Sequence, residues 1–293
     1  MQRKIELFMV SFAALFLEMA VIRWLSAESM IFSYFKNIPL IVAVFGLGLG
    51  CTLAGSVRDR SRYLFFSLLL LIVVVGTRFY QNIPRFSLDD FVMWGFKETI
   101  QPKLVALFFF RFLTIVALVL LPFVGVGQLL GAALKADSPL RAYAINLLGS
   151  LAGLLAFVVV SWMRWPPSLW FLLGGLPLLW FLRSSRQAFL FHIVLLANLV
   201  VMVHFPNLLW ETAGNRVYWS PYSRIEFTPL YDSADQRGEK LGYYLGVNKG
   251  YYQRILDLSP EKVARFPANL GPSLASMPVN EAGMKHCLTS PGT

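Results

Sequence analysis

Long apolar segments recur along this chain, and they constrain its fold more than any other feature. Several approach or exceed the twenty or so residues that a helix needs to cross the hydrocarbon core of a bilayer. Seven segments can be drawn, at Ile5–Leu25, Ile38–Val57, Tyr63–Phe79, Leu104–Leu134, Ala142–Met163, Ser168–Leu182 and Ala188–Phe205. Lipid cannot satisfy the open edges of a sheet, so we expect helices. The sequence therefore predicts an all-α multi-pass membrane protein, with about seven transmembrane helices in residues 1–205.

Two of these segments are irregular. The fourth is too long for one simple crossing and contains Pro122, which predicts a kink or a break. The sixth is short and contains Gly174, Gly175 and Pro177, so it could be tilted, broken or re-entrant. In the longest connection, the stretch SLDDFVMWGF has a capping serine, two acids and then aromatics, which predicts an interfacial helix.

The composition agrees with a protein that lies in lipid. Hydrophobic residues make up 57% of the chain and charged residues only 14%, against about 25% charged in soluble domains. The net charge of +10 arises largely from basic residues that flank the apolar segments, where they would contact anionic lipid. We therefore expect the lipid bilayer to be the partner, and no nucleic acid.

Basic residues in the connections predict the orientation. A cytoplasmic N-terminus would place nine of them inside and six outside, which favours that orientation. Seven crossings would then put the chain from Pro206 outside. It would lie inside if one segment is re-entrant or if the fourth segment crosses twice, and the sequence leaves this open.

The composition changes after Phe205. Val217–Leu230 alternates like a strand and carries Arg224 and Glu226 on one side. A charged turn follows, and then a second apolar strand from Leu241. These features predict a short β-hairpin within residues 206–268, and Tyr251–Leu258 could begin a helix. Residues 269–293 have no apolar period and are expected to be disordered.

Four polar residues within the apolar segments are the candidate functional residues. Ionisable side chains in lipid are costly, so they are functional candidates by default, although a structural ion pair explains them as well. We predict that Glu18, Arg23, Arg111 and Asn146 form an intramembrane polar network. Glu18 and Arg23 are poorly spaced for a direct pair on one helix, so Arg111 is a plausible partner for Glu18.

Small residues mark two helix faces. GLGLG at Gly46–Gly50 lacks the strand and the acidic residue of a nucleotide-binding loop, and it lies within an apolar segment. GSLAG at Gly149–Gly153 has the spacing of a GxxxG motif. Both predict close helix packing. No nucleophile elbow, phosphate-binding loop or metal-ligand spacing occurs, and the two cysteines lie far apart, so no catalytic residue and no metal site is predicted.

Several motifs together resemble one family. FLEMAVIRWLS at Phe16–Ser26, IVAVFGLGLGCTLAG at Ile41–Gly55 and RAYAINLLGSLAG at Arg141–Gly153 resemble helices of bacterial polytopic spermidine synthase-like proteins. SPYSRIEF at Ser220–Phe227 and LGVNKGYYQRILDLS at Leu245–Ser259 resemble the small β region that begins the enzyme part of that family. The resemblance covers roughly residues 6–266 and implies a location in the bacterial inner membrane.

The resemblance also implies what this chain would lack. In the family, a methyltransferase-like domain binds decarboxylated S-adenosylmethionine, and nothing after Pro267 resembles its glycine-rich loop. Tyr252 stands where membrane members tend to have a histidine, and Gln253 matches their glutamine, so both could be remnants of a substrate-facing position. We therefore expect no cofactor in this chain and no synthase activity from it alone. A truncated or frameshifted product, or a natural split form, would explain the pattern.

Three functions remain open. The chain could be the membrane region of a spermidine synthase-like protein. It could instead be a transporter of polyamines or other small molecules, which broken helices and buried charges would fit. It could also be a scaffold that docks a separately encoded synthase domain through its β segment.

Overall fold

The protein is described from a computed structural model. It describes residues 2–55, 61–76, 102–135, 138–212, 214–232 and 238–266. The interfacial helix predicted for SLDDFVMWGF and the disorder predicted for residues 269–293 lie outside the described residues.

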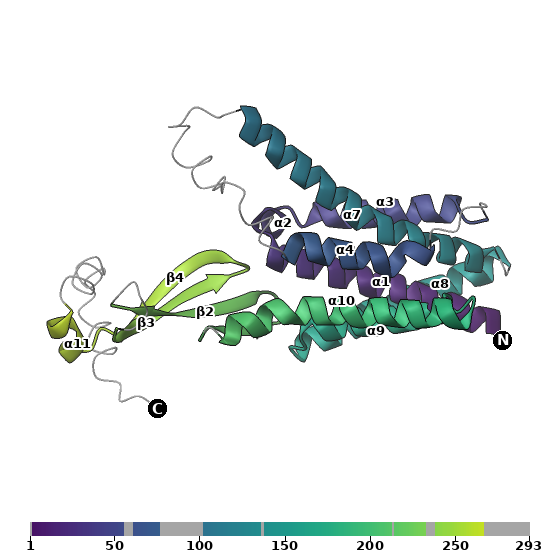
Figure 1. Cartoon of the computed structure of the whole chain (residues 1–293). Helices are drawn as coiled ribbons and strands as arrows, with labels where there is room; N and C mark the ends of the chain where they lie inside the picture. The colour runs from purple at the N-terminus through teal and green to yellow at the C-terminus, as the bar shows by residue number, and fades with distance from the viewer. Residues whose placement is uncertain are drawn as a thin grey trace.

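Most of the described chain is helical, and a small sheet follows the helices (Figure 1). The helices are α1 (Gln2–Glu28), α2 (Met30–Tyr34), α3 (Asn37–Thr52), η1 (Ser61–Tyr63), α4 (Leu64–Gly76), α7 (Pro102–Leu134), α8 (Pro139–Trp162), α9 (Pro167–Leu179), α10 (Arg186–Thr212) and the short α11 (Pro260–Arg265). In the bundle, α1 packs against α7, α8 and α9, α3 packs against α7, and α4 lies against α7 and α10. The helical class predicted from the apolar segments is confirmed.

Four helices are long and apolar enough to cross a membrane: Gln2–Glu28, Val105–Leu134, Pro139–Trp162 and Arg186–Phe205. Helices α3, α4 and α9 are shorter, with 16, 13 and 13 residues. At about 1.5 Å per residue, the two shortest are about 20 Å long, less than the ~30 Å of a hydrocarbon core. The described structure therefore contains four candidate spans, and seven crossings are not established by length.

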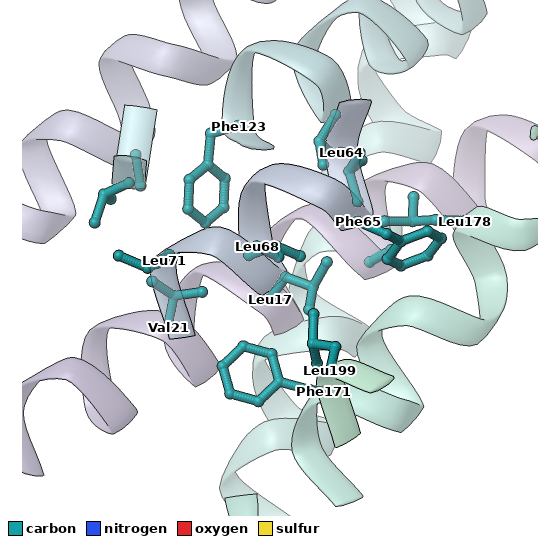
Figure 2. Packing of buried hydrophobic residues seen from close by; sticks show 14 of the residues in the cluster. Leu17, Val21, Leu64, Phe65, Leu68, Leu71, Phe123, Phe171, Leu178 and Leu199 are labelled. Atoms are coloured by element: carbon teal, nitrogen blue, oxygen red, sulfur yellow. The ribbon is translucent and has the colours of Figure 1, made fainter. Parts of the chain in front are cut away.

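The core of the bundle is an apolar cluster with buried residues from eight helices, part of which Figure 2 shows. Leu17 and Val21 of α1 meet Leu68 of α4, Phe123 of α7 and Phe171 of α9, and all five are almost fully buried. The outer surface is apolar as well. Many large side chains of α8 are exposed, including Leu147, Leu148, Leu151, Leu155, Val158 and Val159. A continuous apolar exterior of this kind suits contact with lipid.

The two irregular segments form unbroken helices. Helix α7 continues through Pro122, so the predicted break does not occur there, and its N-terminal half slopes away from the bundle in Figure 1. Helix α9 contains Pro177 near its C-terminal end, where the helix lacks the hydrogen bond that an amide N–H would donate to the carbonyl oxygen of residue 173. Neither proline therefore ends its helix, because other helices pack against both elements.

The glycine faces lie where helices approach most closely, as predicted. A Cβ atom at Gly50 would lie 2.7 Å from the Cα of Gly127 on α7, and one at Gly149 would lie 2.7 Å from the carbonyl oxygen of Phe8 on α1. Real Cβ atoms do not approach other atoms this closely. The packing role predicted for both motifs is confirmed.

The C-terminal part is a four-stranded antiparallel sheet, where the sequence predicted a two-stranded hairpin. Its strands are β1 (Arg216–Trp219), β2 (Arg224–Tyr231), β3 (Lys240–Val247) and β4 (Gly250–Leu256), and they pair in sequence order. The predicted strand Val217–Leu230 is divided by a turn, in which the Ser220 hydroxyl accepts hydrogen bonds from the amides of Tyr222 and Ser223. Pro221 follows Ser220, and its fixed φ suits this position.

The prediction of a helix beginning at Tyr251 is wrong, because this stretch forms β4. Asn248 and Lys249 have φ values of 51° and 62°. Two consecutive residues with positive φ make the tight turn that joins twisted antiparallel strands. The turn therefore brings the chain back alongside β3, and the residues after it form β4, which is an edge strand of the sheet.

Candidate functional site at the junction of the bundle and the sheet

A cluster of ion pairs joins the end of α1 to the sheet. Glu28 is the last residue of α1, and its Oε1 lies 3.0 Å from Nη1 of Arg224, the first residue of β2. The other guanidinium nitrogen, Nη2, lies 3.0 Å from Oε1 of Glu226. Lys249 contacts Oε2 of Glu28. We call Glu28, Arg224, Glu226 and Lys249 the junction cluster.

The junction cluster is largely hidden from water. The side chain of Arg224 is 4% exposed and that of Glu28 is 8% exposed, so solvent screens their attraction little. Arg224 and Glu226 share one face of the strand because side chains alternate with a period of two, as the sequence predicted. The backbone amide of Arg224 also donates to Oδ1 of Asn248, which holds this end of the strand in place.

Arg23 lies beside the junction cluster and connects three parts of the chain. It donates hydrogen bonds to the Ser161 hydroxyl on α8 and to the carbonyl oxygen of Ser220, in the turn before β2. Its guanidinium carbon lies 4.6 Å from the centroid of the Trp170 ring. A cation over an aromatic face is attracted by the ring quadrupole. Arg23 therefore links α1, α8 and α9 to the sheet.

Aromatic packing continues from the bundle into the sheet. The rings of Phe157 and Trp170 lie 5.4 Å apart, and those of Trp170 and Trp219 lie 5.3 Å apart at 81°. Both distances fall in the range of favourable edge-to-face contacts. Trp219 ends β1, so the first strand is held by apolar contacts while the second is held by ion pairs.

A cavity of about 190 Å³ opens between these elements. Three cations line it: Arg23 from α1, Lys36 before α3, and Arg224 from β2. The other lining residues are Met19, Ile22, Ser26, Ala27, Phe157, Trp219, Tyr222, Ser223 and Asn248. None of the residues that line it is acidic. This lining favours an anionic group over a cationic one.

The four predicted intramembrane residues lie at separate places. The Ser11 hydroxyl on α1 donates to Oδ1 of Asn146 on α8, with 2.8 Å between the oxygens. Arg23 lies at the junction, and Arg111 is half-buried on α7. Glu18 is buried in α1, and within the described part of the chain it forms no hydrogen bond or ion pair. Among the described residues, none of these interactions joins the four residues into one network.

Tyr252 and Gln253 lie on β4, away from the cavity lining. Both are exposed, Tyr252 to 63%. Gln253 is opposite Leu245 of β3, and Tyr252 occupies the irregular position where the register shifts. They are therefore presented on the edge strand of the sheet.

The sequence did not point to Glu28, Lys36, Lys249, Trp170 or Trp219 as functional residues. Glu28 follows an apolar segment and Lys249 lies in a turn, and both positions are ordinary surface positions in a sequence. Glu28 and Arg224 are 196 positions apart. The alternation that places Arg224 and Glu226 on one face was the one local signal of the cluster.

The fold and the junction define the class of this protein. It is a mostly helical protein with four helices long and apolar enough to cross a membrane, and it carries a four-stranded antiparallel sheet at one end. In comparisons with known proteins, no family model, curated protein or solved structure matches the chain.

Proposed function

We propose that this chain is an integral membrane scaffold. Its helical bundle holds the β-sheet at the membrane surface, as the membrane region of a spermidine synthase-like protein would. In this proposal the three shorter helices complete a seven-helix bundle. The junction cluster is the observation that best supports the proposal, because the buried ion pair between Glu28 and Arg224 attaches the sheet to the bundle.

The edge strand β4 is the surface that a separately encoded synthase domain would bind. It lies at the end of the strand order, and it exposes Tyr252 and Ile255. An extended segment of a partner can add to such an edge through main-chain hydrogen bonds, while side chains provide specificity. The other edge strand, β1, contacts α10.

Co-purification tests the scaffold. A soluble synthase domain from the same source should be retained by the immobilised membrane protein in detergent. Tyr252→Lys should weaken retention, because it places a charge on the β4 edge. Tyr218→Lys is the matched control, since Tyr218 is half-exposed on β1. Absence of retention, or equal loss in both variants, would refute docking through β4.

We further propose that the chain has no aminopropyltransferase activity by itself. That reaction needs a pocket that holds a cationic amine and a base that removes its proton. The junction cavity is lined by cations, which would repel putrescine. Purified protein incubated with putrescine and decarboxylated S-adenosylmethionine should release no more product than a vector control. Higher turnover would contradict the proposal.

The proposed location is the bacterial inner membrane, with a cytoplasmic N-terminus. Helix α1 runs from the N-terminus to the junction, so the sheet lies at the opposite end of the bundle (Figure 1). This orientation places the sheet on the outer side of that membrane.

A further inference from the structure

We propose that the junction cavity binds a phosphate group, carried either by a lipid headgroup or by a soluble phosphate ester. The inference adds a ligand site to the proposed scaffold. It depends on the cavity and its charges, and it does not require a docked synthase domain.

The first observation is an excess of positive charge. Arg224 has two carboxylate partners, Glu28 and Glu226. Arg23 and Lys36 line the same cavity, and among the described residues neither has a carboxylate partner. Arg23 is bound by neutral oxygens of Ser161 and Ser220. Arg23 is partly buried, and a partly buried cation is costly without an anion nearby. An anion between Arg23 and Lys36 would balance both charges.

The second observation is a set of unused hydrogen-bond donors. The Nε atoms of Arg23 and Arg224 are buried and lack hydrogen-bond partners. A buried donor without an acceptor destabilises the protein by the full desolvation penalty of the group. Guanidinium groups present several N–H donors in a plane, which matches phosphate oxygens. Asn248 also lines the cavity, and its side chain carries a neutral amide donor.

The third observation is the position of the cavity along α1. This helix has 27 residues, so it is about 40 Å long, which exceeds the ~30 Å of hydrocarbon. Its end, with Arg23 and Glu28, therefore lies at the depth of the lipid headgroups. The ion pair that Glu28 makes with Arg224 of the sheet agrees with this depth.

The volume of the cavity agrees with a small anionic group. The cavity measures about 190 Å³, so it has room for more than one water molecule. This space holds a phosphate and part of a glycerol, while acyl chains would have to lie outside. Phe157 and Trp219 provide an apolar wall beside the cations.

The experiment measures binding to the purified full chain in detergent. Native mass spectrometry compares phosphatidylglycerol with phosphatidylcholine, which carries no net charge. Calorimetry with glycerol 1-phosphate tests the soluble source. Saturable binding of phosphatidylglycerol above phosphatidylcholine assigns the site to a lipid headgroup. Binding of glycerol 1-phosphate without this lipid preference assigns it to a soluble phosphate ester.

Variants decide whether the binding occurs in this cavity. Lys36 is exposed at the rim, so Lys36→Gln should fold normally and weaken binding about tenfold, which corresponds to the loss of one charge-assisted contact. Lys36→Arg should restore most of the affinity. Arg164→Gln is the matched control, because Arg164 is exposed just beyond Ser161 and does not line the cavity. The proposal would be overturned if neither probe bound, or if Lys36→Gln left the binding affinity unchanged.

Discussion

At the scale of single residues, Glu28 has the largest predicted effect. Its carboxylate pairs with both Arg224 and Lys249, and its side chain is almost fully buried. Glu28→Gln leaves both cations without this negative charge. Breaking a buried pair by removing one partner costs about 3–5 kcal/mol. The free energy of unfolding of the variant in detergent, measured by chemical denaturation, should fall by about this amount.

Glu239→Gln is the control for this prediction. Glu239 pairs with Arg265 at 2.7 Å, but the arginine side chain is 70% exposed. Exposed pairs contribute about 0–1 kcal/mol, because water screens them and both side chains lose freedom. If the two variants lost equal stability, the junction cluster would not be what fixes the sheet.

Residue identities alone did not reveal the junction cluster or the contacts that Arg23 makes beside it. Arg23 was a candidate because it lies near the end of an apolar segment, and the structure places it beside the sheet. Its neighbours in space, Ser161 and Ser220, lie far along the chain and are unremarkable in sequence. A charge in an apolar segment can be identified locally, whereas its partner is chosen by packing.

At the scale of elements, the glycine faces allow a controlled test of helix packing. Gly48 and Gly50 lie on the same helix, α3, two residues apart. A Cβ at Gly50 would meet Gly127 and Gln128, while nothing lies within 4 Å of one at Gly48. Gly50→Ala should therefore push α3 away from α7 and lower the thermal unfolding midpoint by several degrees.

Gly48→Ala supplies the control for that change. Alanine replaces glycine in a helix with a gain of roughly 0.5–1 kcal/mol when space is available. Its unfolding midpoint should equal or exceed that of the wild type. A larger loss in Gly48→Ala than in Gly50→Ala would contradict the packing of α3 against α7.

The elements also show where local pattern was insufficient. The stretch after Lys249 has an apolar spacing from which a helix beginning at Tyr251 could be predicted. The tight turn at Asn248 and Lys249 explains why a strand forms, because it places the following residues beside β3, with which they pair. Pairing with a neighbour therefore outweighed the local preference, as is usual for strands.

At the scale of the whole molecule, the arrangement predicts sidedness. With a cytoplasmic N-terminus, the C-terminal sheet should lie on the outer face of the inner membrane. In bacteria, alkaline phosphatase fused after Phe266 should be active, and green fluorescent protein fused there should be dark. A fluorescent, phosphatase-inactive pair of fusions would show that the sheet lies in the cytoplasm.

The whole fold was partly predictable from the sequence. The helical class and the positions of the main helices followed from the apolar segments, since helix formation in an apolar medium depends on nearby residues. The number of crossings did not follow, because α3, α4 and α9 are too short for length to decide. Their burial depends on what surrounds them, and α4 packs between α7 and α10.

The helical, lipid-compatible character of this protein and the small-residue faces where helices approach could be predicted from the sequence. Both are properties of neighbouring residues, so they are readable along the chain. The contact of Glu28 with Arg224 across 196 positions, and the cavity that Arg23, Lys36 and Arg224 line together, could be seen only in the folded chain. Contacts between distant residues form because the bundle and the sheet pack together, and that packing depends on the whole chain at once.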